Sequence, residues 1–169
     1  SKKFEFIFDG IDRIKNLINL EKIIRDKLAF KNKIEFNNHH HCHLASTFYP
    51  SGFDRSLIVS YDGLGEYETG LIGIGQKNKI KIIYDKNVFP DSLGLIYSAI
   101  TYFLGWKAFY DEGIIMGLAP YGDPNLKIPN SKKSYIQIFR EIIQYKNGLS
   151  YKINPAWITY NYERNTWLS

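Results

Sequence analysis

The stretch LIVSYDGLGEYETG, residues 57–70, decides how the middle of this chain is expected to fold. β-branched and apolar residues predict a strand over 56–61, and a glycine-containing turn follows it. Two further strands are predicted beyond the turn, at 69–75 and 79–84, joined by the polar turn Gln76-Lys77-Asn78. The sequence therefore predicts three successive strands.

Helical patterns flank these strands on both sides. Before them, apolar residues recur at helical spacing over 11–29, and a second helix-compatible segment spans 39–48. Residues 33–36 are a short link that is compatible with a strand. After the strands, helices are predicted at 93–104, 113–118 and 134–145. This order of elements predicts a mixed α/β protein.

Composition places the chain among single globular domains. Its 169 residues are 44% hydrophobic and 16% aromatic, which excludes intrinsic disorder. The single cysteine, Cys42, excludes an intramolecular disulfide and favours a reducing, cytoplasmic setting. No signal peptide is recognised, and the apolar uncharged stretch 92–106 is shorter than the roughly 20 residues of a membrane span. We therefore expect a soluble protein with no membrane partner.

The net charge of +5 raises the question of nucleic-acid binding. Lysines and arginines are scattered among acids, and no predicted helix or strand collects an arginine-rich face. A nucleic-acid partner is therefore not expected. The same positive charge would suit anionic small molecules such as phosphates.

All four histidines lie in the run His39-His40-His41-Cys42-His43. On a helix, His39 and His43 are four residues apart and face the same way, so both imidazoles can bind one metal ion. Two ligands do not complete a site, so a third, a carboxylate, must come from elsewhere. His40 lies about 100° around the helix and could meet a substrate phosphate. Two simpler interpretations stay open, an adventitious metal-binding surface and a pair of histidines packed in the core.

The turn Asp62-Gly63-Leu64-Gly65-Glu66 is the second candidate for chemistry. Glycines permit close approach of the backbone to a phosphate, while the acids would act through a metal or accept hydrogen bonds from hydroxyls. An ordinary hairpin is the alternative, because Asp-Gly is a common hairpin signal. Cys42 lacks the base and the orienting partner that would mark it as a nucleophile.

Three blocks of sequence occur in a distinctive order. They are HHHCHLASTFYPSGF (39–53), LIVSYDGLGEYETG (57–70), and FPDSLGLIYSAITYFLGW (89–106) followed by EGIIMGLAPYG (112–122). Together they resemble the NodU/CmcH-type O-carbamoyltransferase family in order and spacing. The resemblance covers about residues 34–124, and the flanks match only in general character.

The resemblance implies an α/β fold of the actin-like ATPase, ribonuclease-H-like (Kae1-like) type, present as one incomplete domain over residues 1–169. Family members make carbamoyl adenylate from carbamoyl phosphate and ATP, and transfer the carbamoyl group to a hydroxyl of a secondary-metabolite acceptor. Adenylate formation belongs to a separate YrdC-like C-terminal domain. Transfer belongs to the Kae1-like domain, which holds a divalent metal, typically iron; zinc is the alternative, because the same ligands accept both.

The resemblance also assigns roles to single residues. His39 and His43 match the family's metal-binding histidines, with a later aspartate as the third ligand. His40 is the predicted catalytic residue, which would contact carbamoyl phosphate or orient the acceptor. The predicted nucleotide- and substrate-binding residues are Asp62, Gly63, Gly65 and Glu66, with Gly117 in the opposite wall.

Several family features are missing from the chain. The opening strand and its glycine turn, the late aspartate and the YrdC-like domain have no counterpart before Ser169. Ile114 stands where the family usually carries a lysine, and Leu44 where it usually carries an alanine. We therefore expect an internal piece of a longer enzyme, inactive alone, or a degenerate relative. The alternatives are a non-catalytic module that binds a nucleotide or a protein partner, and a metal-dependent hydrolase with Glu66 as its base.

Overall fold

The computed structural model describes residues 18–146 and 148–158. The chain divides into two units, residues 1–37 and 38–169. The described part of the first unit contains one helix, α2 (Leu20–Leu28), in which the Arg25 guanidinium pairs with the Glu21 carboxylate at 2.6 Å. This helix confirms the later part of the segment predicted over 11–29, whose beginning lies outside the described residues.

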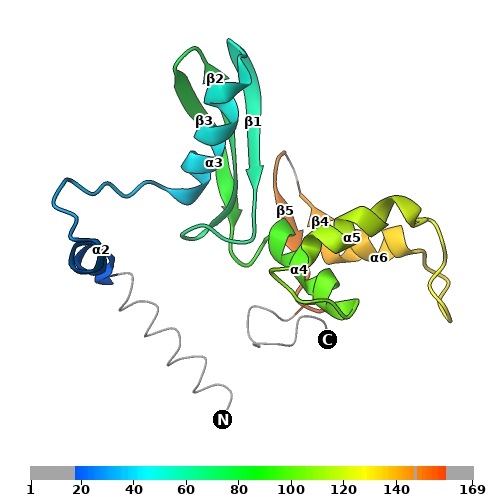
Figure 1. The fold of residues 1–169 in the computed structure, drawn as a ribbon. Coiled ribbons are helices and arrows are strands. Elements are labelled where there is room, and N and C mark those ends of the chain that lie inside the picture. The colour runs from blue at the N-terminus through cyan, green and yellow to red at the C-terminus, as the bar shows by residue number, and fades with distance from the viewer. Residues whose placement is uncertain (1–17, 147, 159–169) are drawn as a thin grey trace. The chain divides into compact units, whose positions relative to one another are not determined.

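The second unit is organised around a three-stranded antiparallel sheet in the order β1-β2-β3 (Figure 1). Its strands are β1 (Arg55–Tyr61), β2 (Glu68–Gln76) and β3 (Lys79–Val88). The three predicted strands are confirmed, and the turn after β1 joins it to β2 as a hairpin. Along β1, side chains point alternately to the two faces of the sheet, so that Ile58 is buried while Leu57 and Val59 are exposed.

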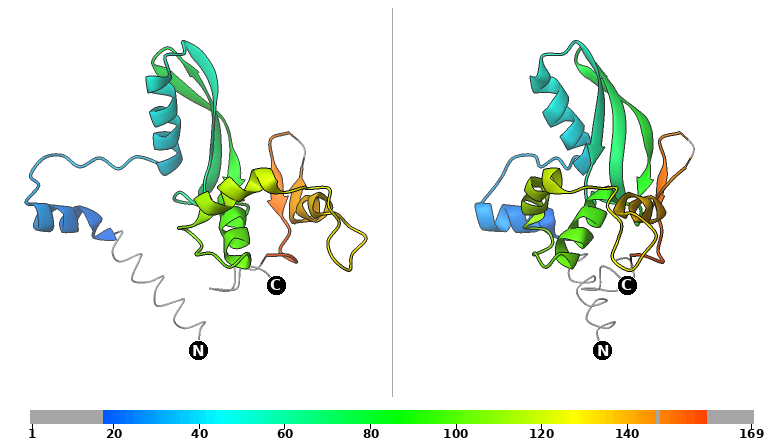
Figure 2. Two further views of the ribbon diagram at one scale, coloured as in Figure 1. Left: turned by 45° about the vertical axis from the view of Figure 1, so that its right-hand side comes forward. Right: turned by 90° about the vertical axis from the view of Figure 1, so that its right-hand side faces the viewer.

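Helix α3 (His39–Phe48) confirms the helix predicted over the histidine run and lies along one face of this sheet (Figure 2). The contact is made by a small apolar core: Leu44, Phe48, Ile58 and Leu71, with Ile80 and Ile82 at its border. Leu44 is 1% exposed and so fills this core. Burial of these side chains fixes the helix, and with it the histidines, beside β1 and β2.

A second apolar core lies among the C-terminal elements of the same unit. These elements are α4 (Leu93–Phe103), α5 (Glu112–Leu118), α6 (Tyr135–Ile142), β4 (Ile143–Tyr145) and β5 (Tyr151–Ile153). Two short 3-10 turns lie in the described part of the unit: η1 (Tyr49–Ser51) follows α3, and η2 (Ala119–Tyr121) follows α5. The buried members of the core are Ile96, Ile142, Tyr151, Ile153 and Ile158. In the described part of the chain, no helix has both the length and the apolar character to cross a membrane.

One local prediction is wrong. The helix predicted over 134–145 ends at Ile142, because Ile143 turns extended and β4 pairs with β5 in a second hairpin. The paired residues lie six to ten positions apart along the chain, so helical periodicity within 134–145 could not reveal the pairing. Residues 33–36, a link whose sequence is compatible with a strand, form no strand, and the Phe36 side chain is 62% exposed. The mixed α/β class itself is confirmed.

Candidate metal centre

The first turn of α3 is held in place by two polar side chains. The Asn38 side-chain oxygen accepts a hydrogen bond from the His41 backbone N–H at 3.0 Å, which caps the helix. Glu66, from the β1–β2 loop, accepts from the His39 backbone N–H at 3.3 Å and from the Asn38 amide at 3.0 Å. A carboxylate at this position also complements the positive end of the helix dipole. The cap therefore sets where the histidine run begins.

Three ligand atoms converge where α3 meets the β1–β2 loop. One Asp62 oxygen, Oδ2, lies 2.7 Å from His39 Nε2 and 3.1 Å from His43 Nε2, and the two Nε2 atoms are 3.0 Å apart. Within the described residues, these three form the group of His, Cys, Asp or Glu side chains that could hold a metal ion. Asp62 is thus available as the carboxylate ligand that the histidine spacing required from elsewhere in the chain.

The donor set and its spacing fit a divalent transition metal. Ligand atoms about 2.1 Å from an ion and at right angles to one another would lie about 3 Å apart, which matches the observed separations. Two imidazoles and one carboxylate on one side of an ion leave other positions open, an arrangement typical of non-haem iron. The side chains of His39 and His43 are 42% and 48% exposed, so solvent or a substrate can reach the group.

Asp62 stays ionised over the whole physiological pH range. Burial alone would raise its pKa, but hydrogen bonds from His39, the Gly63 backbone and His43 outweigh burial and lower the pKa to about 2. The second oxygen, Oδ1, accepts from the Gly63 N–H at 2.6 Å, which leaves Oδ2 for the histidines. A permanent negative charge is what a cation site needs.

His40 lies apart from this group, in the interior. Its side chain is fully buried, with Nδ1 2.8 Å from the Ser60 hydroxyl and Nε2 3.0 Å from the Glu68 carbonyl oxygen. A carbonyl oxygen can only accept, so Nε2 carries the proton and Nδ1 accepts from Ser60. Burial lowers the pKa of His40, which favours this neutral tautomer. Both ring nitrogens are used by the protein itself, and contact with a substrate stays a prediction.

The core-packing interpretation therefore applies to one histidine and not to the pair at i and i+4. His40 packs in the core, whereas His39 and His43 face outward beside Asp62. The sequence carried one signal for this difference, the place of His40 about 100° around the helix.

The glycines of the turn bring the loop close to the helix. A Cβ atom on Gly65 would lie 3.0 Å from the His40 ring and 3.3 Å from His39 Cβ, so a side chain there would press on the histidines. Gly63 has more room, since its Cβ would meet only Leu95 at 3.8 Å. The Glu66 carboxylate accepts hydrogen bonds from the Asn38 amide and the His39 N–H at the start of α3. Glu66, which was predicted as a binding residue, therefore also stabilises this end of the helix.

A hollow of about 280 Å³ adjoins the metal-binding group. The residues that line it are His43, Thr47, Val59, Ser60, Tyr61 and Asp62. It therefore shares two of the three candidate ligands and adds polar groups from α3 and β1. A small molecule bound here would lie directly beside the metal position.

The predicted opposite wall is not part of this group. Gly117 and Ile114 lie on α5, where Ile114 is 46% exposed and a Cβ on Gly117 would meet nothing within 4 Å. Neither residue lines the hollow. The nucleotide- or substrate-binding role of Gly117 stays a prediction.

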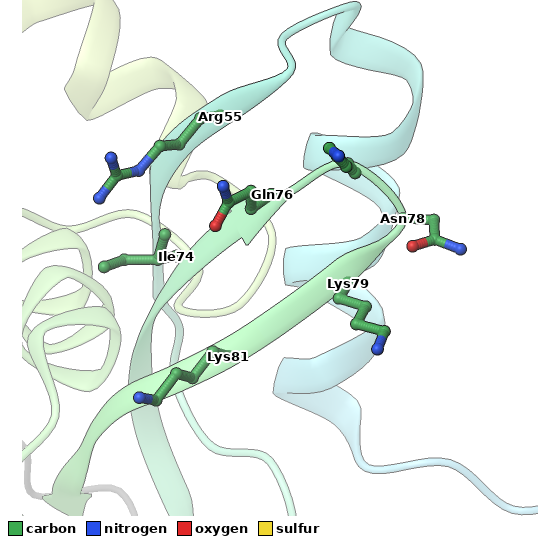
Figure 3. A pocket seen from close by; sticks show the side chains of 7 residues that line it. Arg55, Ile74, Gln76, Asn78, Lys79 and Lys81 are labelled. Atoms are coloured by element: carbon green, nitrogen blue, oxygen red, sulfur yellow. The ribbon is translucent and has the colours of Figure 1, made fainter.

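A larger depression of about 640 Å³ lies at the far end of the sheet (Figure 3). Its lining residues are Arg55, Ile74, Gln76, Lys77, Asn78, Lys79 and Lys81, four cations among them. Among the described residues, its lining contains no histidine, cysteine or carboxylate that could serve as a metal ligand. The metal-binding group beside α3 is therefore the better candidate for chemistry.

Comparison with known proteins gives a family match for most of the chain. The family model described as "Carbamoyltransferase N-terminus" matches residues 10–169, which is wider than the stretch 34–124 that carries the sequence resemblance. An uncharacterized protein of Synechocystis sp. is 37% identical over 126 residues, which cover 74% of this chain and 19% of that protein.

Two nodulation proteins are also similar. Nodulation protein NolNO of Sinorhizobium fredii is 45% identical over 94 residues, covering 54% of this chain and 13% of the relative. Nodulation protein NolO of Bradyrhizobium diazoefficiens is 35% identical over 119 residues, covering 69% and 20%. The chain thus spans about a fifth or less of the length of these relatives.

Proposed function

The chain belongs to the carbamoyltransferase N-terminus family, and from this premise we propose that it forms part of an O-carbamoyltransferase. The enzyme would transfer a carbamoyl group to a hydroxyl of a small-molecule acceptor. The observation that carries the proposal is the convergence of His39, His43 and Asp62 beside an open hollow. The proposal includes the actin-like, ribonuclease-H-like (Kae1-like) fold, with which the mixed α/β architecture is compatible, and a cytoplasmic setting for the enzyme.

His39, His43 and Asp62 would hold a divalent metal, with iron favoured over zinc by the two-histidine, one-carboxylate set. When bound, such an ion acts as a Lewis acid toward a carbonyl or phosphoryl oxygen. The low pKa of Asp62 keeps one negative charge in the ligand set at neutral pH. Glu66 and Asn38 hold the start of α3, so the imidazoles keep their spacing.

The hollow would receive the carbamoyl group. Thr47 and Tyr61 line it beside His43 and Asp62. The Thr47 hydroxyl donates to the His43 carbonyl oxygen at 2.9 Å, so it can accept a hydrogen bond from a bound molecule. Holding the carbamoyl carbon next to the acceptor hydroxyl supplies much of the rate in a group transfer. Transfer forms the bond from the acceptor oxygen to the carbamoyl carbon and breaks the bond from that carbon to the phosphate oxygen.

The donor would be carbamoyl adenylate, made from carbamoyl phosphate and ATP. The family resemblance assigns that synthesis to a YrdC-like domain, so this proposal concerns the transfer step. Two relatives are nodulation proteins, which is consistent with a secondary-metabolite hydroxyl as acceptor. Their length is several times that of this chain, so full turnover is proposed for the longer protein.

Metal binding by the 169-residue chain tests the proposal. We expect about one zinc or ferrous ion per chain after chelation and reloading, and a loss of at least tenfold in affinity in His43→Ala and Asp62→Asn. His41→Ala is the matched control, because His41 is exposed on the same helix and outside the group.

The carbamoyl donor provides the second half of the test. Carbamoyl phosphate, used as a stand-in for the carbamoyl and phosphate groups of the adenylate, should bind the metal-loaded chain more tightly than the metal-free chain, as measured by isothermal titration calorimetry. Absence of specific metal in the wild-type chain, or equal affinity in His43→Ala, would refute the metal site. That result would favour the non-catalytic module.

A further inference from the structure

We propose that Ser92 and Gly94, at the start of α4, are positioning residues that fix the metal-binding carboxylate of Asp62. The inference rests on the proposed metal site and concerns residues that do not touch the metal themselves. Helix α4 begins directly after Ser92, and its first turn lies against the peptide that joins Asp62 to Gly63. The metal-binding turn would therefore be clamped from a helix 30 residues further along the chain.

Ser92 forms the first part of this clamp. Its side chain is fully buried, and its hydroxyl oxygen lies 3.0 Å from the Asp62 carbonyl oxygen and 2.7 Å from the Gly63 carbonyl oxygen. The hydroxyl also accepts from the Leu95 N–H at 3.0 Å, as the N-cap of α4. One hydroxyl has one proton to donate and two lone pairs, so it can cap the helix and bind the turn together.

Gly94 forms the second part through close approach of two backbones. A Cβ atom on Gly94 would lie 2.4 Å from the Gly63 nitrogen and 2.5 Å from the Asp62 carbonyl carbon. Both are backbone atoms, so they cannot move aside as a flexible side chain does. Any residue other than glycine here must displace either the start of α4 or the Asp62–Gly63 peptide.

The clamp reaches the ligand through the backbone of Asp62. Before this residue, the backbone is fixed because the Asp62 N–H donates to the Thr69 carbonyl oxygen at 3.1 Å. After it, the contacts with Ser92 and Gly94 fix the following peptide. His39 and His43 come from α3, a separate element, so the three ligand atoms meet only while the turn keeps this place.

Metal sites are sensitive to displacements of this size. Ligand distances are typically held within about 0.2 Å, and loss of a partner that orients a ligand commonly lowers metal affinity by about 10–100-fold. We therefore expect variants of the clamp to weaken metal binding although every ligand is still present.

Zinc titration of the 169-residue chain against a competing chelator tests the clamp. We expect Ser92→Ala and Gly94→Ala to weaken zinc binding by at least tenfold. Gly113→Ala is matched to Gly94→Ala, because Gly113 is also the second residue of a helix and has open space for a Cβ. Ser134→Ala is matched to Ser92→Ala, because Ser134 is the N-cap of α6 and lies outside the site. Both controls should keep wild-type affinity within about twofold.

Thermal unfolding of all variants separates positioning from general loss of stability. Zinc affinity within twofold of wild type in both folded clamp variants would overturn the inference and leave the metal site standing. If Gly94→Ala fails to fold, Ser92→Ala decides the question by the same criterion. No zinc binding by the wild type would overturn the metal site itself. Amide hydrogen exchange at Asp62 and Gly65 in the metal-free chain would then decide the clamp, with faster exchange expected in Ser92→Ala than in Ser134→Ala.

Discussion

His40 ties three segments of the chain together through one buried imidazole. It lies on α3, donates to the Glu68 carbonyl oxygen and accepts from Ser60. Replacement by phenylalanine would leave the Ser60 hydroxyl buried without its partner, and the Glu68 carbonyl oxygen would lose one of two donors and keep the Gly65 N–H. Such buried polar groups cost about 1–3 kcal/mol each. The contacts of His40 with Ser60 and Glu68 therefore give it a structural role.

We predict that His40→Phe lowers the free energy of unfolding by about 2–5 kcal/mol, measured by urea denaturation. His41→Phe serves as the control, because His41 is exposed on the same helix, and it should change stability by no more than about 0.5 kcal/mol. A loss in His40→Phe as small as in the control would contradict the structural role.

Glu112 joins α5 to α4 and predicts a dependence of stability on pH. One of its oxygens accepts from the Ser98 hydroxyl and from the Phe109 N–H, each at 2.6 Å. Burial would raise the pKa of Glu112, but these hydrogen bonds lower it below the ordinary value of 4.5. A carboxylate with a lowered pKa stabilises the folded state above the unfolded pKa and loses that contribution as pH falls through the folded pKa.

We therefore expect urea denaturation to show a loss of stability as the pH falls from about 5 to 3, part of which disappears in Glu112→Gln. Ser98→Ala should reduce the same part. Asp123→Asn is the control, because Asp123 is exposed and its carboxylate accepts only from the nearby Asn125 N–H among the described contacts. Equal pH profiles for wild type and Glu112→Gln would refute the assignment.

At the scale of elements, α3 approaches the sheet closely because β2 carries glycine beneath it. A Cβ atom on Gly75 would lie 2.5 Å from two ring carbons of Phe48, and one on Gly73 would lie 3.4 Å from Leu44. The ring of Phe48 therefore packs directly on the backbone of β2. Phe48 is the last residue of α3, and the same helix carries His39 and His43 in its first half.

We predict that Gly75→Ala destabilises the chain by about 1–3 kcal/mol, because the ring must leave its position in a packed core. Gly122→Ala is the control, since its Cβ would meet only the Ala119 carbonyl oxygen, at an ordinary 3.5 Å. It should change the free energy of unfolding by less than about 0.5 kcal/mol. Thermal or urea unfolding of both variants checks the difference.

At the scale of the whole molecule, Asp91 connects the two apolar cores of residues 38–169. Its carbonyl oxygen accepts from Thr69 on β2 at 2.5 Å and from the Tyr151 hydroxyl at 3.1 Å. Its carboxylate, in a residue 5% exposed, accepts from the Ile153 N–H at 2.7 Å and from Lys152 at 2.6 Å. The loop before α4 is thus bound both to the first sheet and to the β4–β5 hairpin.

We expect Asp91→Asn to lower stability by about 1–3 kcal/mol, since two charge-assisted hydrogen bonds lose their charge. Hydrogen exchange should speed up in β4 and β5 more than in β1, because the hairpin depends on this carboxylate. Asp123→Asn again provides a surface carboxylate for comparison. If hydrogen exchange in Asp91→Asn increases equally in β1 and in the β4–β5 hairpin, the hairpin does not depend specially on this carboxylate and the prediction is wrong.

Several features could be predicted from the sequence because they depend on neighbours along the chain. Strand and helix periodicity located β1, β2, β3 and α3, and the i, i+4 spacing put His39 and His43 on one side of a helix. The three motif blocks pointed to the family that the comparison then showed. Local periodicity gave a wrong prediction where pairing with another strand determines the conformation. Ile143 is the example, because it pairs with Ile153 and does not continue the helix.

Only the tertiary structure decided which groups meet in space. The histidine spacing required a carboxylate ligand, but the resemblance placed Asp62 among the nucleotide- and substrate-binding residues. Only the structure shows that the Asp62 carboxylate lies 2.7 Å from His39 Nε2. The place of His40 around the helix set it apart from His39 and His43, but only the structure showed that His40 is buried and that Gly94 allows α4 to touch the Asp62–Gly63 peptide. The physical reason is that backbone periodicity is a local property, whereas ligand convergence and close packing depend on contacts between segments 19 or more residues apart.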